Sequence, residues 1–471
     1  MRPVIEKGSS NGIIPAPVFF APGAGSFSLA GATVSGELSA YTAGLLDLPV
    51  TDVGSIHLEL GVSPAKGGYY LTVTQAGIRI EADATAGLFA GVQTLRQLAS
   101  DGEVPVVRIE DHPRFEYRGA MLDVTRHFFS VADVKRYIDG IALLKLNFLH
   151  LQLTDDQGWR IEITSWPELT RTSATTQVGG NGGGFYSQQD YREIVEHAAS
   201  RFVTIVPEID MPGHTNAAIV AYPALGDVPA EPYEGIEVGF SSLAIRKEGT
   251  YAFVDDVIRE VAALTPGPYL HIGGDESLAT TEEDFLAFVE RSSAIAAFYG
   301  KTPIGWHELG QSRRLPPGTI GQYWGFTTAQ EGAADLARSF VEQGGQIIMS
   351  PADVAYLDIK YDEDSPHGLD WANGPTSVRQ AYEWDPASIV PGIGDEHVLG
   401  VEAPIWTETM STIDQVEFMS FPRLAAIAEI AWSPRAGRTW NDFEQRLAWL
   451  GRVWDAAGTR FYRAPGIPWH D

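Results

Sequence analysis

The chain contains no cysteine among its 471 residues. Disulfide bonds, thiolate catalysis and cysteine-ligated metals are therefore excluded. Long apolar runs are also missing, since no uninterrupted stretch approaches the length of a membrane-spanning helix. The N-terminal residues lack the basic and then apolar order of a signal peptide. We therefore expect a cytoplasmic location, although a secreted chain from which a signal had been removed would look the same.

Positively charged residues are also few. There are 33 Lys and Arg residues against 61 Asp and Glu residues, which gives a net charge of −28. Such an acidic surface argues against nucleic acid and anionic membranes as partners, and we expect a monomer or a weak homodimer. The composition is 44% hydrophobic and 20% charged, as in globular proteins with a large core. The length suits an α/β barrel with a smaller module.

Residues 1–115 contain no tryptophan, whereas ten of the twelve tryptophans lie after residue 300. Alternating apolar and polar residues predict strands at 55–60, 69–73 and 77–81, and an amphipathic helix follows over 84–99. We predict a smaller α+β domain here. The missing tryptophans argue against a sugar pocket in this part of the chain.

Residues 116–471 alternate strand-like and helical runs. The predicted strands are 119–124, 147–153, 204–209, 269–272, 302–306, 320–323, 346–349 and 398–402. The predicted helices are 131–144, 191–200, 251–264, 282–299, 329–343 and 414–431. Eight strands alternating with helices indicate an α/β fold of the (β/α)8 TIM barrel type. A last helix over 441–456 is expected to pack on the outside of the barrel.

Polar and aromatic residues follow nearly every predicted strand. They are Asp123, Arg126, Asp155, Asp156, Glu208, Asp210, His214, Asp275, Glu276, Trp306, His307, Trp324, Tyr356, Asp358, Trp406 and Glu408. In a parallel barrel the loops after the strands meet at one mouth, where catalytic groups collect.

The pair Asp275–Glu276 follows an apolar run and two glycines. Acidic residues are also common at helix N-termini, but the buried strand and the glycines favour catalysis. A retaining glycosidase normally places two carboxyls about 5–5.5 Å apart on opposite sides of the anomeric carbon. Two residues that are adjacent in the sequence cannot easily flank one bond in this way, so they suit two different roles. Glu276 would protonate the leaving oxygen while Asp275 supports a nucleophile that belongs to the substrate, such as a 2-acetamido group.

Tryptophans at strand ends suit a sugar pocket, because aromatic rings cover the apolar faces of pyranoses. Trp306, Trp324 and Trp406 each follow a strand-like run, and Trp371 lies in a long loop. Three other tryptophans fall in or directly after predicted helices and are expected to pack in the core: Trp432, Trp449 and Trp454.

Arg126 has a planar fork of donors that suits two neighbouring sugar hydroxyls. His214 paired with Asp155 would make an oriented imidazole beside Glu276. Each of these residues alone is more often part of a structural ion pair. A metal cluster of His214, His271, Asp155 and Asp275 is conceivable, but no HExxH spacing supports zinc.

The glycine-rich segment 179–184 does not fit GxGxxG and follows no strand, so we predict a mobile surface loop.

Several motifs in order resemble glycoside hydrolase family 20, the β-N-acetylhexosaminidases, and in particular bacterial enzymes of the Streptomyces type. They are His-Ile-Gly-Gly-Asp-Glu at 271–276 and the segments 122–128, 153–160, 207–214, 305–307, 322–325, 356–358 and 406–408. The resemblance covers essentially the whole chain. It implies a non-catalytic N-terminal domain (1–115) and a catalytic barrel (116–471) that removes terminal, non-reducing GlcNAc or GalNAc from oligosaccharides or glycoconjugates, without a cofactor or metal.

The resemblance also implies a role for each site residue. Glu276 is the general acid/base, and Asp275 holds the acetamido N–H and stabilises an oxazolinium intermediate. Tyr356 binds the acetamido carbonyl, and Trp306, Trp324 and Trp406 enclose its methyl group. Arg126, Asp358 and Glu408 bind ring hydroxyls. Asp155 and His214 support the acid/base, and Trp371 is a platform for the leaving sugar.

Three rival functions remain open at this point. They are a disaccharide-releasing enzyme like lacto-N-biosidase, a catalytically silent sugar-binding barrel and a metal hydrolase. Carbohydrate metabolism, including chitin degradation, is the expected biological setting. The loops 172–185 and 361–384 are predicted to control aglycone preference.

Overall fold

The computed structural model describes residues 12–180, 182–330 and 332–470. It divides into two compact units. The first, the sheet unit, comprises Met1–Glu116, Gly140–Leu146 and Ala425–Asp471. The second, the barrel unit, comprises Tyr117–Asp139 and Asn147–Leu424. The first segment of the sheet unit ends at Glu116, and residues 425–471 group with the N-terminal sheet and not with the barrel.

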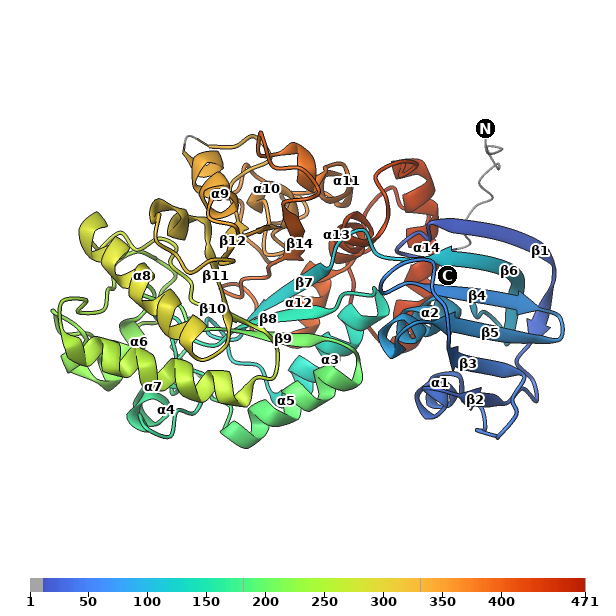
Figure 1. Ribbon diagram of the computed structural model, residues 1–471, viewed down its shortest axis with the longest axis horizontal. Coiled ribbons are helices and arrows are strands. Elements are labelled where there is room, and N and C mark those ends of the chain that lie inside the picture. The colour runs from blue at the N-terminus through green and yellow to red at the C-terminus, as the bar shows by residue number, and fades with distance from the viewer. Residues whose placement is uncertain (1–11, 181, 331, 471) are drawn as a thin grey trace. The chain divides into compact units, whose positions relative to one another are not determined.

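The sheet unit contains a six-stranded mixed sheet in the order β1-β6-β4-β5-β3-β2 (Figure 1). Its strands are β1 (Phe19–Ser28), β2 (Val34–Gly36), β3 (Ile56–Leu60), β4 (Tyr69–Thr74), β5 (Gly77–Ala82) and β6 (Glu103–Asp111). Its first two helices are α1 (Ser39–Leu46) and α2 (Thr85–Leu98). The three strands and the helix that the sequence predicts are confirmed. The buried side of α2 packs in the same apolar core as alternate residues of the strands.

The C-terminal helix α14 (Trp440–Ala457) belongs to the sheet unit because its buried face makes contacts there. Arg446 donates to the backbone oxygen of Ile13 at 2.8 Å and forms a bidentate ion pair with Glu429 at 2.6 Å. Trp454 is buried on the same helix, as expected, but Trp449 is 44% exposed. The prediction of a core position for Trp449 is therefore wrong, because this residue lies off the inward stripe.

The barrel unit is a closed, parallel, eight-stranded barrel in the order β10-β11-β12-β13-β14-β7-β8-β9 (Figure 1). Its strands are β7 (Tyr117–Asp123), β8 (Phe148–Gln152), β9 (Thr204–Glu208), β10 (Tyr269–His271), β11 (Thr302–Trp306), β12 (Ile320–Tyr323), β13 (Ile347–Met349) and β14 (Val398–Ala403). All eight predicted strands are confirmed to within a few residues. Nearly every strand residue is buried, because each barrel strand is covered on both faces.

Helices alternate with these strands. They are α3 (Val131–Leu143), α4 (Glu168–Ser173), α5 (Gln188–Ser200), α6 (Asn216–Ala221), α7 (Glu248–Leu264), α8 (Glu282–Phe298), α9 (Ala333–Glu342), α10 (Ala352–Ala355), α11 (Val378–Tyr382), α12 (Ile413–Ser420) and α13 (Arg423–Trp432). Short 3-10 turns are η1 (Pro223–Leu225), η2 (His307–Gln311) and η3 (Pro386–Ser388).

The single helix predicted over 414–431 is wrong, because it is divided into α12 and α13. Pro422 has no N–H to donate and disfavours a helical conformation in the residue before it. Phe421 is accordingly extended, with φ −99° and ψ 131°. The break reorients the chain after α12.

The inside of the barrel is arranged in layers, because residues two apart on a strand point to the same side. One layer is apolar and consists of Tyr117, Phe148, Val206, Ile304, Ile320, Ile348 and Leu399. Two residues further along the strands, the interior becomes polar: His150 follows Phe148, and Glu208 follows Val206. The mouth lies beyond that polar layer.

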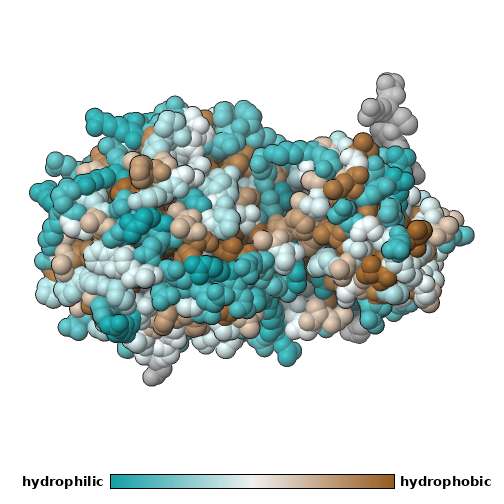
Figure 2. Space-filling view, turned by 60° about the horizontal axis from the view of Figure 1, so that its bottom comes forward, coloured by the Kyte–Doolittle hydropathy of each residue, from teal (hydrophilic) through white to brown (hydrophobic). Residues whose placement is uncertain are grey.

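Among the described residues, no helix combines the length and apolar character that crossing a membrane requires. Most residues on the face shown in Figure 2 are hydrophilic, and hydrophobic residues are scattered among them. The acidic composition agrees with such a surface.

Candidate active site

A cavity of about 210 Å³ lies at the C-terminal ends of the barrel strands. It is lined by Arg126, Ile236, Val238, Asp275, Glu276, Trp306, Trp324, Tyr356, Asp358, Leu369, Trp371, Trp406 and Glu408. The lining residues follow seven different strands, so that distant segments of the chain meet in one place. This is the position where barrel enzymes carry their chemistry.

The two glycines before Asp275 are required by close packing. A Cβ on Gly273 would lie 1.6 Å from Asp210 Oδ1, and one on Gly274 would lie 2.1 Å from Leu309 Cδ1. Both have positive φ angles, 66° and 100°. Glu276 itself has φ 41°, a conformation that is uncommon for a residue with a side chain. Such an arrangement is typical of functional sites, where surrounding contacts hold the backbone in place.

This turn gives the neighbouring carboxyls different surroundings. The side chain of Asp275 is 12% exposed, whereas that of Glu276 is 36% exposed. Burial raises the pKa of Asp275 to about 8, while the nearby His214 acts in the opposite direction. The ring nitrogen Nε2 of His214 lies 3.7 Å from Asp275 Oδ2 and 3.7 Å from Glu276 Oε2. One imidazole therefore reaches both acids from behind.

A row of charged side chains connects His214 through Asp155 to Arg126. Asp155 Oδ1 lies 3.1 Å from His214 Nδ1, and Asp155 Oδ2 lies 2.9 Å from Arg126 Nη1. Although burial opposes ionisation, Arg126 and His214 hold the pKa of Asp155 below its ordinary value. Burial also opposes a charge on His214, but Asp155, Asp210 and Asp275 raise its pKa well above its ordinary value. The imidazole is thus held protonated and oriented.

Three indole rings and a phenol enclose one side of the cavity. The ring centroids of Trp306 and Trp406 are 5.8 Å apart, and that of Tyr356 lies 6.2 Å from Trp406. Trp324 donates from Nε1 to both carboxyl oxygens of Glu308, at 3.1 and 3.0 Å. Burial and the nearby Asp358 raise the pKa of Tyr356, so its hydroxyl stays protonated and able to donate.

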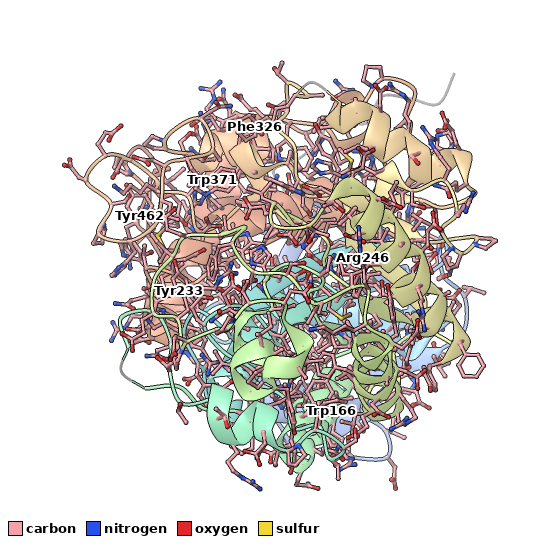
Figure 3. The ribbon with its side chains drawn as sticks, turned by 90° about the vertical axis from the view of Figure 1, so that its left-hand side faces the viewer. Trp166, Tyr233, Arg246, Phe326, Trp371 and Tyr462 are labelled. Carbon is pink, nitrogen blue, oxygen red and sulfur yellow. The ribbon has the colours of Figure 1, made fainter. Side chains whose placement is uncertain are left out.

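Trp371 stands at the outer edge of the cavity and is 46% exposed. Its ring centroid lies 6.5 Å from that of Phe326 and 5.8 Å from that of Tyr356. Figure 3 shows Trp371 and Phe326 near each other at the same end of the barrel. An exposed ring at the mouth is available to a group that projects from the cavity.

Several buried polar atoms of residues that line the cavity have no hydrogen-bond partner among the described residues. They include Nε of Arg126, both carboxyl oxygens of Asp358 and Oε2 of Glu408. Burial raises the pKa of Glu408 to about 7, and burial together with Glu408 raises that of Asp358. Unpaired buried polar groups are costly unless a ligand completes them. A polyhydroxylated ligand would supply the missing partners.

The structure brings ten of the twelve predicted site residues into the cavity lining. The other two, Asp155 and His214, lie directly behind it. Of the conceivable metal cluster, His214, Asp155 and Asp275 lie together, but His271 lies deeper, with Nδ1 2.7 Å from Glu208 Oε1. Residues of the first predicted aglycone loop, 172–185, do not line the cavity in the part of the chain that is described.

Sequence reasoning missed Glu308, Ile236 and Val238. Glu308 lies two residues after Trp306, and its place in the same strand-end loop was the available signal. Ile236 and Val238 belong to an irregular segment between η1 and α7, for which no pattern indicates a position.

Two family models match the chain. The model "Glycosyl hydrolase family 20, catalytic domain" matches residues 115–283 and 277–435, and "Glycosyl hydrolase family 20, domain 2" matches residues 11–112. The chain is 44% identical over 411 residues to a β-N-acetylhexosaminidase from Cellulomonas fimi, with 85% of this chain and 81% of the relative covered. It is 28% identical to the N,N'-diacetylchitobiase of Vibrio harveyi, with 80% of this chain and 57% of that protein covered.

Solved structures agree with these relationships. The N-acetyl-β-hexosaminidase of Streptomyces plicatus in complex with Thio-NAglucal has a TM-score of 0.94 and 46% identity, with 99% of each chain covered. A β-N-acetylhexosaminidase from Streptomyces coelicolor has a TM-score of 0.94 and 45% identity, with 99% of this chain and 100% of that chain covered. The family models, the sequence identities and the shared fold agree, and the chain belongs to glycoside hydrolase family 20.

Proposed function

We propose that this glycoside hydrolase is an exo-acting, retaining β-N-acetylhexosaminidase that removes terminal, non-reducing β-linked GlcNAc or GalNAc. The observation that carries the proposal is the acidic pair at the edge of an indole-lined cavity. Asp275 is buried beside the indoles, and Glu276 reaches the open side. One acid therefore suits the acetamido group and the other suits the leaving oxygen.

In the proposed first step the acetamido carbonyl oxygen of the substrate attacks C1. The bond between C1 and the leaving oxygen breaks, and Glu276 gives its proton to that oxygen. The product is a cyclic oxazolinium ion. Asp275 accepts a hydrogen bond from the acetamido N–H, and the positive charge that develops favours its ionised form. The protonated hydroxyl of Tyr356 donates to the acetamido oxygen and directs it toward C1.

In the second step a water molecule attacks C1 on the face that the leaving group vacated. Glu276 takes a proton from this water, and the acetamido oxygen leaves C1, so that two inversions give retention. Trp306, Trp324 and Trp406 enclose the methyl group and exclude water from the intermediate. Arg126, Asp358 and Glu408 bind the ring hydroxyls, because they line the cavity with buried polar atoms that have no hydrogen-bond partner among the described residues.

Asp155 and His214 support the acid/base from behind, and Trp371 offers its exposed ring to the leaving sugar. Release of a single sugar is favoured over release of a disaccharide, because the cavity measures only about 210 Å³ and the half-exposed Trp371 is already part of its lining. We also propose chitin-type oligosaccharides as substrates, which the similarity to a diacetylchitobiase supports.

The experiment compares two aryl glycosides that differ only at C2. The N-acetylglucosaminide is expected to turn over and the glucoside is not. Comparable rates on both would contradict the proposal. Product sizes from chito-oligosaccharides distinguish the two release modes: the monosaccharide alone is expected, and disaccharide as the first product would favour the lacto-N-biosidase type of activity.

A further inference from the structure

The polar layer inside the barrel carries charges that the proposed mechanism does not use. His150 lies on β8, Glu208 on β9, His271 on β10 and Glu402 on β14, and each is at most 1% exposed. Barrel interiors are usually filled by branched aliphatic side chains. Burying a charge costs on the order of several kcal/mol for each ion, unless partners surround it. A charged layer directly below the cavity therefore needs a reason.

His150 is the centre of this layer. Its Nε2 lies 2.9 Å from Glu208 Oε2, and its Nδ1 lies 2.9 Å from Glu402 Oε1. Burial opposes protonation of the ring, but Glu402 and Glu208 together raise the pKa of His150 to about 10. At neutral pH the layer therefore contains an imidazolium held between two carboxylates.

The two carboxylates differ in what else they contact. Glu402 accepts from Nε2 of Gln322 at 2.7 Å and from the hydroxyl of Tyr117, and neither of these residues lines the cavity. Glu208 accepts from the indole Nε1 of Trp306 at 3.0 Å. Trp306 does line the cavity. Glu208 is thus the member of the layer that is bonded to the cavity wall.

A second imidazole fixes Glu208 further. His271 Nδ1 lies 2.7 Å from Glu208 Oε1, and the ring centroid of His271 lies 5.0 Å from that of Trp306. Burial works against ionisation of Glu208, but His271 and His150 hold its pKa below the ordinary value. The carboxylate therefore stays ionised and has little freedom to rotate.

We propose that Glu208 is a positioning residue that fixes the plane of the Trp306 indole and thereby sets the size of the N-acyl group that the cavity accepts. The claim rests on the proposed function, in which Trp306 encloses the acetamido methyl group. The imidazolium of His150 anchors the carboxylate, the carboxylate orients the indole N–H, and the indole face limits the acyl group. Loosening the carboxylate lets the ring tilt and admits longer acyl chains.

The test uses aryl glycosides of N-acetyl-, N-propanoyl- and N-butanoylglucosamine. Wild-type turnover of the N-acetyl substrate is measured first, and its absence would refute the proposed function and leave this inference without a basis. For Glu208→Gln we expect the ratio of kcat/KM between the N-acetyl and N-propanoyl substrates to fall roughly fivefold or more, because a methylene in a tight pocket discriminates by about 10- to 200-fold.

Glu402→Gln is the matched control. It removes the other carboxylate from the same imidazolium, and the described hydrogen-bond partners of Glu402 do not line the cavity. Both variants are expected to lower the melting temperature, but Glu402→Gln should leave the acyl ratio within about twofold of the wild type, as for a residue that acts only on stability. Equal changes of the ratio in both variants would overturn the proposal.

Glu208→Asp covers the case in which Glu208→Gln does not fold. It keeps the charge beside His150 but is one methylene shorter, so it should loosen the indole with a smaller loss of melting temperature. The same fall of the acyl ratio is expected, and an unchanged ratio would contradict the proposal.

Trp306→Phe, which removes the indole N–H, completes a double-mutant cycle. In that background the effect of Glu208→Gln on the ratio should shrink to about twofold or less, and an undiminished effect would show that Glu208 acts by another route.

Discussion

The sheet unit and the barrel unit both contain buried carboxyl groups, but these groups differ in their hydrogen-bond partners. In the sheet unit, Asp111 accepts from the Tyr69 hydroxyl at 2.8 Å, from Lys145 Nζ at 3.0 Å and from the Trp432 indole at 2.9 Å. At the barrel mouth, both carboxyl oxygens of Asp358 have no partner among the described residues. A carboxylate with a full set of partners holds a fold together, whereas one that lacks partners awaits a ligand.

This comparison predicts that acids at the mouth affect rate and that acids in the sheet unit affect stability. The largest effect is expected for Glu276→Gln, which removes the proposed proton donor. For substrates with a poor leaving group, such as a sugar, turnover should fall about 100- to 10,000-fold. Aryl leaving groups that need little protonation should suffer much less. A uniform loss across leaving groups would remove Glu276 from the acid role.

Asp111→Asn is expected to show the opposite pattern. Removing one member of a buried ion pair costs about 3–5 kcal/mol, so the free energy of unfolding measured with denaturant should fall by that order. The kcat/KM of the folded protein should stay unchanged. Asp101→Asn is the control, since its side chain is 81% exposed and should cost less than about 0.5 kcal/mol. A specific loss of kcat in Asp111→Asn would break the comparison.

Asp275→Asn should lower kcat roughly 100-fold or more, because it removes the group that we propose stabilises the developing positive charge. Its melting temperature should change little or rise, because burial disfavours the charged form of Asp275, whose pKa is raised to about 8. Steady-state kinetics and thermal unfolding of the same sample check both statements. A variant near the wild-type rate would contradict the role of Asp275.

Glu308, a mostly buried acid near the mouth, is expected to make the stability of the protein depend on pH. Burial raises its pKa from an ordinary value of 4.5 to about 7. The folded state therefore binds this proton more tightly than the unfolded state, and the contribution of Glu308 to stability is present below about pH 4.5 and is lost as the pH rises toward 7.

Glu308→Gln should remove that dependence, which amounts to about 1–3 kcal/mol for a side chain that is one-fifth exposed. Denaturant unfolding at pH 4.5 and pH 7 measures this difference. An equal change in the free energy of unfolding between the two pH values in the variant and the wild type would refute the raised pKa of Glu308.

Much of the barrel was predictable because its strands are buried on both faces. β12 (Ile320–Tyr323) has the bounds that the sequence predicts, and Trp324 follows it directly at the mouth. The break at Pro422 was visible in the sequence, yet the apolar periodicity on both sides of it masked the change of direction. The grouping of α14 with the sheet unit depends on tertiary contacts such as that of Arg446 with Ile13, which no local pattern encodes.

The site was predicted where polar residues follow a strand end, and it was missed in the irregular segment with Ile236 and Val238 and at the contact of Glu208 with Trp306. Asp275 and Glu276 stand out because two glycines precede them. Glu208 stands at a strand end too, but its contact with Trp306 joins residues 98 positions apart. Single-sequence patterns report spacing along one segment, so a hydrogen bond between two strands of the barrel leaves no signal in them.

The central claim is that the substrate's own acetamido oxygen attacks C1. The most direct measurement is kcat for a series of aryl glycosides whose N-acyl group carries zero, one, two or three fluorine atoms. Fluorine withdraws electrons from the carbonyl oxygen without a large change in size, so the account predicts that kcat falls steeply with each added fluorine. A kcat that is independent of fluorination would contradict it.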